Sequence, residues 1–334
     1  MKILALFILI SAFLYGETTL KIATYNVENL FDLKRDGHEY KEYIPYTKAN
    51  WNRRTYNIKL NNIARVIKEI NADIIALQEI ESLQALKDLR FTLKQKGLYY
   101  QYYAIAQYKN TNIKVALLSK VPFVATHEVA VTSSYRYRNI LETKFKIQNQ
   151  EFYILVNHWK SKAGPESQRI VSAKKLMKRV KEIGEDKNII LLGDFNSDYE
   201  EYKVFKRKRK HNDTDGITGI NHILKSINYT DSAKQTHLEK GDFYNLLYDA
   251  DKENRWTYIF RGKKGNLDNI LVSSSLLEKG GITYKYNSVD TYNPPYLFKG
   301  KYIYRWQVSR AKVRRHKAKG YSDHLALTAE FLVH

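Results

Sequence analysis

Cysteine is absent from the 334 residues of this chain. Its absence excludes disulfide bonds, thiolate metal ligands, a cysteine nucleophile and a lipid anchor attached to cysteine. Long apolar runs are scarce, and the run Ile3–Leu14, interrupted by Ser11, is too short to span a bilayer comfortably. A Gly-x-Ser-x-Gly motif, typical of one large class of serine hydrolases, is also missing. Without disulfide bonds, the fold depends on its hydrophobic core.

The N-terminus has the pattern of an export signal. Lys2 supplies a positive start, Ile3–Leu14 an apolar segment, and Gly16 a small residue for cleavage. We therefore predict a signal peptide over residues 1–16 and a mature domain over 17–334, secreted or periplasmic, with no transmembrane anchor after cleavage. The alternative is that this segment forms a buried N-terminal strand or helix.

The charge balance is strongly basic. Lys and Arg number 56 against 35 Asp and Glu, which gives a net charge of +21. Such a field favours a polyanionic partner and accelerates its capture. Nucleic acid, an anionic membrane surface and an acidic polysaccharide all fit, and so does general basicity of the source proteome. No stable protein partner is evident from the sequence.

Hydrophobic patterns predict one α/β domain in which sheet stacks on sheet and helices lie outside. Apolar residues at helical spacing predict helices at 57–70, 82–96 and 165–183. Stretches rich in Val, Ile, Tyr and Phe predict strands at 20–26, 73–79, 99–107, 113–119, 123–131, 140–147, 152–158, 189–192, 255–261, 267–272 and 325–333. Residues 262–266 are expected to form a turn, and residues 280–320 an irregular tail.

Residues capable of chemistry stand at the ends of these strands. They are Asn26, Glu79, His158, Asp194 with Asn196, Asp268, and Asp323 with His324. Each one alone has an ordinary explanation, because acids cap helices and Asn suits tight turns. Six such endings in one chain favour a shared site.

The residue types suit attack on a phosphodiester. Hard cations such as magnesium take oxygen ligands, which Glu79 and the region of Asp194 can supply. A histidine beside a carboxylate can take a proton from water, and Asp268 with His324 suits that pairing. His158 is then left as a second acid or electrophile. A metal, two histidines and neutral amides together favour hydrolysis of a phosphodiester by water.

The motifs around these residues extend over nearly all of the mature chain. They are TYNVENLFD at Asn26, ALQEIE at Glu79, VNHWKSKAGPESQR at His158, LLGDFNSD at Asp194, LDNILVSSSL at Asp268 and YSDHLAL at His324. In type and order they resemble the endonuclease/exonuclease/phosphatase superfamily, typified by DNase I, and within it the secreted bacterial nucleases. The resemblance implies a four-layer α-β-β-α sandwich, with two stacked mixed β-sheets flanked by helices.

The resemblance also implies roles for the residues. A magnesium ion, or manganese or calcium in its place, would be held mainly by Glu79, with help from Asn26, Asp194 or Asp323. His324 with Asp268 would generate the attacking hydroxide. His158 would stabilise the phosphate or protonate the leaving oxygen. The remaining pair, Asp194 and Asn196, would position the phosphate, the water or the metal.

Basic segments adjoin two of these strand ends. Six of the eight residues in Lys203–Lys210 are Lys or Arg, and no acid occurs between Thr291 and Ser322. Both segments are candidates to follow a phosphate backbone, or to be solvated loops. The weaker candidates for phosphate contact are Arg169, Arg314 and Arg315. The aromatic residues of the tail can stack on bases or pack inside it, and they are Tyr292, Tyr296, Tyr302, Tyr304 and Trp306.

The sequence thus predicts a secreted, metal-dependent endonuclease that cleaves DNA, or both DNA and RNA, with little sequence specificity. One alternative is a secreted phosphodiesterase acting on a lipid headgroup, as a sphingomyelinase does. The other is a non-catalytic nucleic-acid-binding protein on the same scaffold. This last alternative predicts that some of the six strand endings are lost, whereas all six are present.

Overall fold

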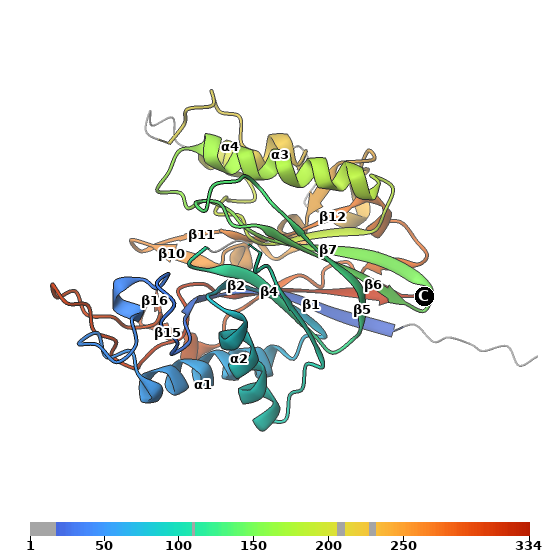
Figure 1. The fold of residues 1–334 in the computed structure, drawn as a ribbon. Helices are drawn as coiled ribbons and strands as arrows, with labels where there is room; N and C mark the ends of the chain where they lie inside the picture. Colours follow the sequence, from blue (N-terminus) through green and yellow to red (C-terminus); the bar gives the residue numbers. More distant parts are fainter. Residues whose placement is uncertain (1–17, 109–110, 206–210, 227–231) are drawn as a thin grey trace, which may run out of the picture.

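The computed structural model describes residues 18–108, 111–205, 211–226 and 232–334. The predicted signal peptide, residues 1–16, lies outside the described residues, and so does most of the basic segment Lys203–Lys210. Figure 1 shows four layers: helices, a sheet, a second sheet and helices again. The predicted α-β-β-α sandwich is therefore confirmed.

The first sheet has seven strands and both parallel and antiparallel pairs. Its strand order is β13 (Ile282–Tyr284), β17 (Ala326–Val333), β1 (Thr18–Leu30), β2 (Ile74–Ile80), β4 (Lys114–Ser119) and β3 (Tyr102–Ile105), with β14 (Asp290–Tyr292) also pairing with β17. Strands β1 and β2 are parallel, and β17 is antiparallel to β1.

The second sheet has six strands. Its order is β5 (Phe123–Val129), β6 (Ile140–Ile147), β7 (Gln150–His158), β8 (Ile189–Asp194), β12 (Asp268–Ser273) and β9 (Phe243–Asn245). Strands β7 and β8 are parallel, and β12 is antiparallel to β8. Two hairpins lie outside the large sheets, β10–β11 (Tyr258–Phe260, Lys263–Gly265) and β15–β16 (Phe298–Lys299, Tyr302–Ile303).

Helices cover the outer face of each sheet (Figure 1). They are α1 (Arg53–Ile70) and α2 (Leu83–Gln95) on the first sheet, and α3 (Glu166–Ile183) and the short α4 (Glu201–Val204) on the second. Single turns of other helix types occur at Lys41–Tyr43, Gly219–Ile223, Ala233–Gln235, Leu246–Asp249, Lys252–Asn254, Ser274–Leu276 and Pro295–Leu297. None of the helices in the described part of the chain is long and apolar enough to cross a membrane.

Side-chain alternation explains why the sheets bury both faces. In β8, Ile190 and Leu192 join the core between the two sheets, whereas Ile189 and Leu191 point the other way and pack beneath α3. Successive side chains of a strand point to opposite faces, so a strand covered on both faces reads as an uninterrupted apolar run. This pattern is the reason that IILL was recognisable as a strand.

Several predicted boundaries differ from the structure. Helix α1 begins at Arg53 rather than residue 57, because Asn52 caps it by accepting a hydrogen bond from the backbone N–H of Thr55. The predicted strand 255–261 contributes only β10, which pairs with β11 inside the segment expected to be a turn. The actual turn is Arg261–Gly262, with φ angles of 49° and 79° that suit a two-residue hairpin. The tail is also less irregular than predicted, since β13 and β14 join the first sheet.

Strand directions bring the polar endings together. Strands β1, β2, β7 and β8 all end at one edge of the sandwich, and β12 and β17 begin there. In Figure 1 this is the edge opposite the C-terminus and the grey N-terminal trace. The candidate site is built at this edge.

Candidate active site

Three neighbouring strands of the second sheet place His158, Asp194 and Asp268 side by side. His158 pairs with Asp194 in the β7–β8 ladder, and Asp268 pairs with Asp194 in the β8–β12 ladder. Gly193 allows this close packing, since a Cβ atom there would lie 2.1 Å from the carbonyl oxygen of Asn157. Its φ of 131° is also unfavourable for any other residue.

Asn26 joins the two sheets at the site. Its side-chain nitrogen donates to Oε1 of Glu79 at 3.1 Å and to Oδ2 of Asp194 at 3.0 Å. Its side-chain oxygen accepts from the backbone N–H of Glu28 at 3.0 Å. In this orientation Asn26 presents a donor to the carboxylates, rather than the oxygen that its predicted metal contact requires. The metal contact of Asn26 stays a prediction.

His324 and Asp268 form the predicted pair. Nδ1 of His324 lies 2.7 Å from Oδ2 of Asp268, and both residues are buried. Burial alone would lower the pKa of His324, but the neighbouring carboxylates, Asp268 foremost, outweigh it and raise this pKa well above its ordinary value. Nε2 lies 4.0 Å from Oδ2 of Asp194. One ring nitrogen is therefore held, and the other faces the centre of the site.

His158 has the opposite electrostatic character. Its Nε2 lies 3.5 Å from Oδ2 of Asp194 and 3.9 Å from Oε1 of Glu79. Burial, together with the nearby Arg138 and His324, lowers the pKa of His158 well below its ordinary value. Its buried Nδ1 has no hydrogen-bond partner among the described residues. The site thus combines a neutral histidine with one that favours the charged form.

Asn196 stands in a turn directly after β8. Its φ is 47°, and its backbone N–H donates to Oδ1 of Asp194 at 2.8 Å. Its side-chain nitrogen donates to the carbonyl of Trp159 at 3.2 Å, and the Trp159 ring packs edge-on against Phe195. The aromatic between the two polar residues is therefore a buried anchor, which fixes the orientation of Asp194 and Asn196.

Asp323 lies at the rim of the same site. Its Oδ1 is 4.0 Å from Nε2 of His324, and its Oδ2 is 2.9 Å from Nη2 of Arg305. The structure thus brings together all eight residues predicted for catalysis or metal binding: Asn26, Glu79, His158, Asp194, Asn196, Asp268, Asp323 and His324.

The residues present suit a divalent cation. Glu79, His158 and Asp194 each offer a ligand atom within 4.8 Å of the others, and so do Asp194, Asp268 and His324. Burial raises the pKa of Asp194 to about 7, and burial together with Asp323 raises that of Glu79. Buried carboxylates this close repel one another, so a bound cation would stabilise their charged forms. Carboxylate oxygens are the ligands that magnesium prefers.

The predicted phosphate contact of Arg169 does not agree with its burial. The residue is 1% exposed, and its Nε donates to Oε2 of Glu166 at 2.7 Å. Its Nη1 donates to the carbonyl of Ser161 at 3.0 Å, in the loop after β7. The N–H groups that a phosphate would need are already bonded to Glu166 and to the carbonyl of Ser161. Arg169 holds the loop that follows His158.

Arg314 and Arg315 are exposed on a loop closed by the bridge between Val308 and His316. Arg314 lies 3.1 Å from a carboxylate oxygen of Glu42. Their phosphate contacts stay predictions.

The aromatic residues of the tail divide between packing and exposure. Trp306 is 2% exposed, whereas Tyr302 is 51% exposed. Tyr292 and Tyr296 bind Glu69 through their hydroxyls, and Tyr304 packs edge-on against Tyr321. Only Trp306 is thus buried, and the half-buried Tyr292, Tyr296 and Tyr304 make contacts within the protein.

Sequence reasoning missed Arg138, which lies on the loop before β6. Its Nη1 donates to the carbonyl of Trp159 at 3.0 Å. Burial lowers the pKa of Arg138, while the nearby Glu79, Tyr40 and Asp194 act to raise it. The side chain is therefore a cation beside the buried carboxylates. Nothing in its local sequence separates it from the neighbouring Arg136.

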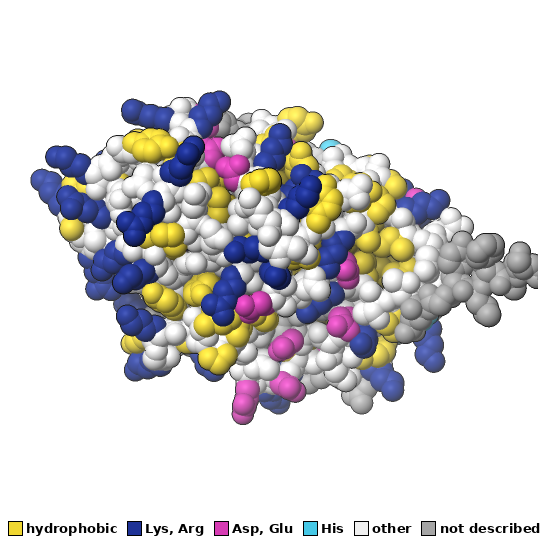
Figure 2. All heavy atoms as spheres, turned by 90° about the horizontal axis from the view of Figure 1, so that it is seen from below, with side chains coloured by type: hydrophobic (Ala, Val, Ile, Leu, Met, Phe, Trp, Pro, Cys, Tyr) yellow, Lys and Arg dark blue, Asp and Glu magenta, His cyan; other side chains and the backbone are white. Residues whose placement is uncertain are grey.

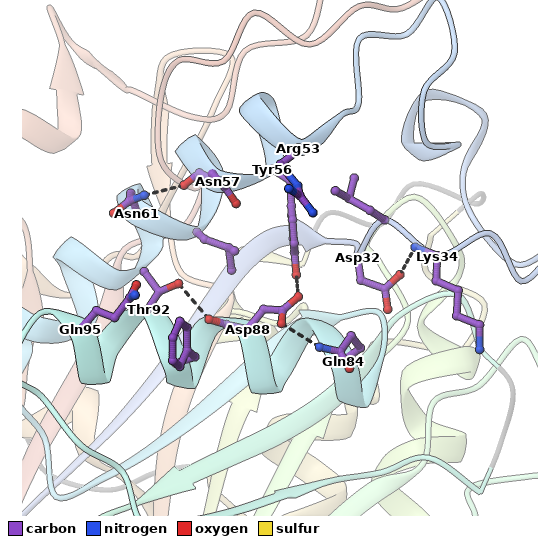
Figure 3. Close-up of a pocket in the computed structure, with 13 residues that line it drawn as sticks. Asp32, Lys34, Arg53, Tyr56, Asn57, Asn61, Gln84, Asp88, Thr92 and Gln95 are labelled. Carbon is purple, nitrogen blue, oxygen red and sulfur yellow. Dashed lines mark hydrogen bonds between the residues drawn. The ribbon is translucent and has the colours of Figure 1, made fainter.

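A cavity of about 560 Å³ lies between α1 and α2. Figure 3 shows Asp88 of α2 pointing across it toward Tyr56 of α1. Asp88 already accepts from the Tyr56 hydroxyl at 2.9 Å and from Gln84 at 2.7 Å. The bond with Tyr56 fastens the two helices to each other, whereas the bond with Gln84 lies within α2. None of the residues lining the cavity is one of the carboxylates and histidines of the candidate site.

The four layers, with buried carboxylates and two histidines at one edge, form a phosphodiesterase and phosphatase fold. The chain belongs to the endonuclease/exonuclease/phosphatase family, whose model matches residues 21–228 and 217–331. Enzymes of this family hydrolyse phosphoesters and depend on divalent metal ions. A comparison with curated proteins gave no match.

Solved structures share the fold. Humanized TDP2 from D. rerio is 14% identical, with a TM-score of 0.57, and the match covers 94% of this chain and 98% of that one. Truncated TDP2 from Caenorhabditis elegans is 17% identical, with a TM-score of 0.56 and the same coverage. A mannosyl-6-phosphatase from Bacteroides thetaiotaomicron is 18% identical, with a TM-score of 0.54, and covers 94% and 100%. At these identities the similarity extends to the fold alone.

Proposed function

We propose that this protein is a secreted, magnesium-dependent endonuclease that hydrolyses phosphodiester bonds in DNA with little sequence specificity. The observation that carries the proposal is the charge at the edge where the site opens. Figure 2 shows Lys and Arg side chains gathered at the left end of one face, the end at which Figure 1 places β10–β11 and β15–β16. Lys and Arg side chains at the edge that holds a phosphoesterase site favour a polyanionic substrate over a small neutral one.

The two histidines have distinct parts in this proposal. His324, held at Nδ1 by Asp268, exchanges a proton at Nε2, which faces Asp194. His158, neutral and close to Asp194 and Glu79, donates a hydrogen bond to the phosphoryl group. A divalent ion bound at Glu79 and Asp194 would polarise a phosphoryl oxygen and offset the charge of the carboxylates.

Arg138 adds a cation to this site. Its guanidinium lies close enough to Glu79 and Asp194 for their charges to affect its pKa. A planar guanidinium matches two oxygens of a phosphate. We assign it to hold the scissile phosphate, a role that the buried Arg169 does not have.

The second candidate is a phosphodiesterase that acts on a lipid headgroup, such as a sphingomyelinase, and one observation favours it. Phe260 is 61% exposed and Tyr302 is 51% exposed, and their strands β10 and β16 contact each other at the active-site edge. Exposed aromatic side chains suit a membrane interface. The cations Arg261, Lys263 and Lys264 on the same hairpin suit nucleic acid as well as an anionic membrane.

One experiment separates these functions. The purified protein is incubated with plasmid DNA, RNA, sphingomyelin vesicles and p-nitrophenyl phosphate, first with magnesium and then with EDTA. We expect magnesium-dependent nicking of the plasmid and no release of the headgroup. Cleavage of the vesicles without cleavage of the plasmid would replace the nuclease proposal with the lipid one. Hydrolysis of the monoester alone would identify a phosphatase, the activity for which one of the structural neighbours is named.

A further inference from the structure

Strand β1 is distorted just beyond Asn26. Glu28 and Asn29 have φ angles of 53° and 61°, and the pairing of β1 with β2 shifts between Asn26 and Leu30. Non-glycine residues seldom adopt this left-handed conformation, and it persists only where surrounding contacts hold it. Glu28 is nevertheless only 6% exposed, so an acidic side chain is turned inward at a strained position.

The contacts of Glu28 explain this arrangement. Its Oε1 accepts from Nε of Arg305 at 2.8 Å and also from Nη2, and its Oε2 accepts from the backbone N–H of Trp306 at 3.0 Å. Its own backbone N–H donates to the side-chain oxygen of Asn26 at 3.0 Å, which turns the nitrogen of Asn26 toward the site. Glu28 therefore connects the site with residues 305–306, which lie about 280 positions away in sequence.

Arg305 extends these contacts to the site itself. Its Nη2 lies 2.9 Å from Oδ2 of Asp323, while the other oxygen of Asp323 is 4.0 Å from Nε2 of His324. The guanidinium thus binds two carboxylates at once, one buried and one at the rim of the site. A planar guanidinium restrains the angle as well as the distance of a carboxylate, which an ammonium does not.

We propose that Arg305, anchored by Glu28, is a positioning residue that fixes the carboxylate of Asp323 for phosphodiester hydrolysis. The inference rests on the proposed function in so far as Asp323 belongs to the reacting site. A purely structural role would need only the contacts of Glu28 with Arg305 and Trp306. The ion pair with Asp323 is the contact that this role leaves unexplained.

The test uses bis(p-nitrophenyl) phosphate, a small diester that lacks the polyanionic backbone of nucleic acid. We expect Arg305→Met to lower kcat by roughly 10- to 100-fold with little change in KM, since small displacements of a reacting group have effects of this size. Arg305→Lys should have an intermediate kcat, because lysine keeps the positive charge but lacks the planar guanidinium that bonds two carboxylates at fixed angles. Glu28→Gln should lower kcat less than Arg305→Met, since the amide oxygen still accepts from Arg305 and only the bond from the backbone N–H of Trp306 is lost.

A double-mutant cycle decides whether Arg305 acts through Asp323. In an Asp323→Asn background, Arg305→Met should lower kcat by no more than about twofold further, because coupled residues are not additive. Independent effects that multiply would overturn the proposal. So would an Arg305→Met enzyme whose kcat falls only with its folded fraction, measured by thermal unfolding.

The matched control is Arg179→Met. Arg179 pairs with the buried Glu142 through contacts of 2.6 and 2.9 Å, near the end of α3. This variant should lose comparable stability and retain kcat. If the wild-type enzyme hydrolyses the small diester but not DNA, DNA is refuted as the substrate, while the variants still test the role of Arg305. If it hydrolyses neither, the proposed function and this inference are both overturned.

Discussion

His316 is a buried neutral histidine that we expect to make the protein sensitive to acid. Its ring packs against Tyr43, Trp51 and Trp306, and the residue is 2% exposed. The indole N–H of Trp306 donates to Nδ1 at 2.8 Å, so Nδ1 carries no proton. Nε2 therefore carries it and donates to the carbonyl of Glu42 at 2.9 Å. Protonation of Nδ1 would remove the bond with Trp306.

The size of the effect follows from the pKa. Burial and the nearby Lys59 lower the pKa of His316 to about 4. The hydrogen bond to the carbonyl of Glu42 acts in the opposite direction but is outweighed. The unfolded chain binds this proton near pH 6.5 and the folded chain only near pH 4, so the free energy of unfolding falls as the pH drops between these values. At about 1.4 kcal/mol for each pH unit, the loss amounts to about 3 kcal/mol.

Urea unfolding at pH 7, 6, 5 and 4.5 measures this loss. A His316→Phe variant is less stable at pH 7, because it loses two hydrogen bonds, but it lacks the titration. The difference in unfolding free energy between wild type and variant should therefore shrink as the pH falls, while groups common to both cancel. His237→Gln, at an exposed position, is the control. Parallel curves for wild type and His316→Phe would refute the reasoning.

Four further predictions follow from the site and its supports. Asp268→Asn should lower plasmid cleavage by roughly 10²- to 10⁴-fold without unfolding, because the amide no longer stabilises charged His324; activity within tenfold of wild type would contradict this. EDTA should abolish cleavage and magnesium restore it, as followed by plasmid nicking. Gly193→Ala should cost about 3 kcal/mol or more, because its Cβ would overlap the carbonyl of Asn157; an unchanged Tm would count against it. Arg169→Met should lower Tm, because the buried carboxylate of Glu166 loses its partner, but should leave KM for DNA unaltered. A raised KM would instead support the predicted contact of Arg169 with phosphate.

The residues of the candidate site were accessible from sequence because their signals are local. In LLGDFNSD, an apolar run predicts the strand, and Asp194 and Asn196 follow at its end. Ser82 likewise stands at the start of the helix predicted at 82–96, and in the structure its hydroxyl caps α2 by accepting from the N–H of Ala85. Short-range periodicity and capping depend on neighbours within a few positions, which the sequence displays directly.

By itself, then, the sequence determined the order of most elements and the eight residues that converge at one edge. Tertiary structure alone decided which arginine serves which purpose. Arg169 and Arg305 look alike in sequence, yet one is buried against Glu166 and the other joins Glu28 to Asp323. The physical reason is that the burial of a long side chain depends on how remote elements pack around it. Glu166 is only three positions from Arg169, but Glu28 is 277 positions from Arg305, and no local pattern records that contact.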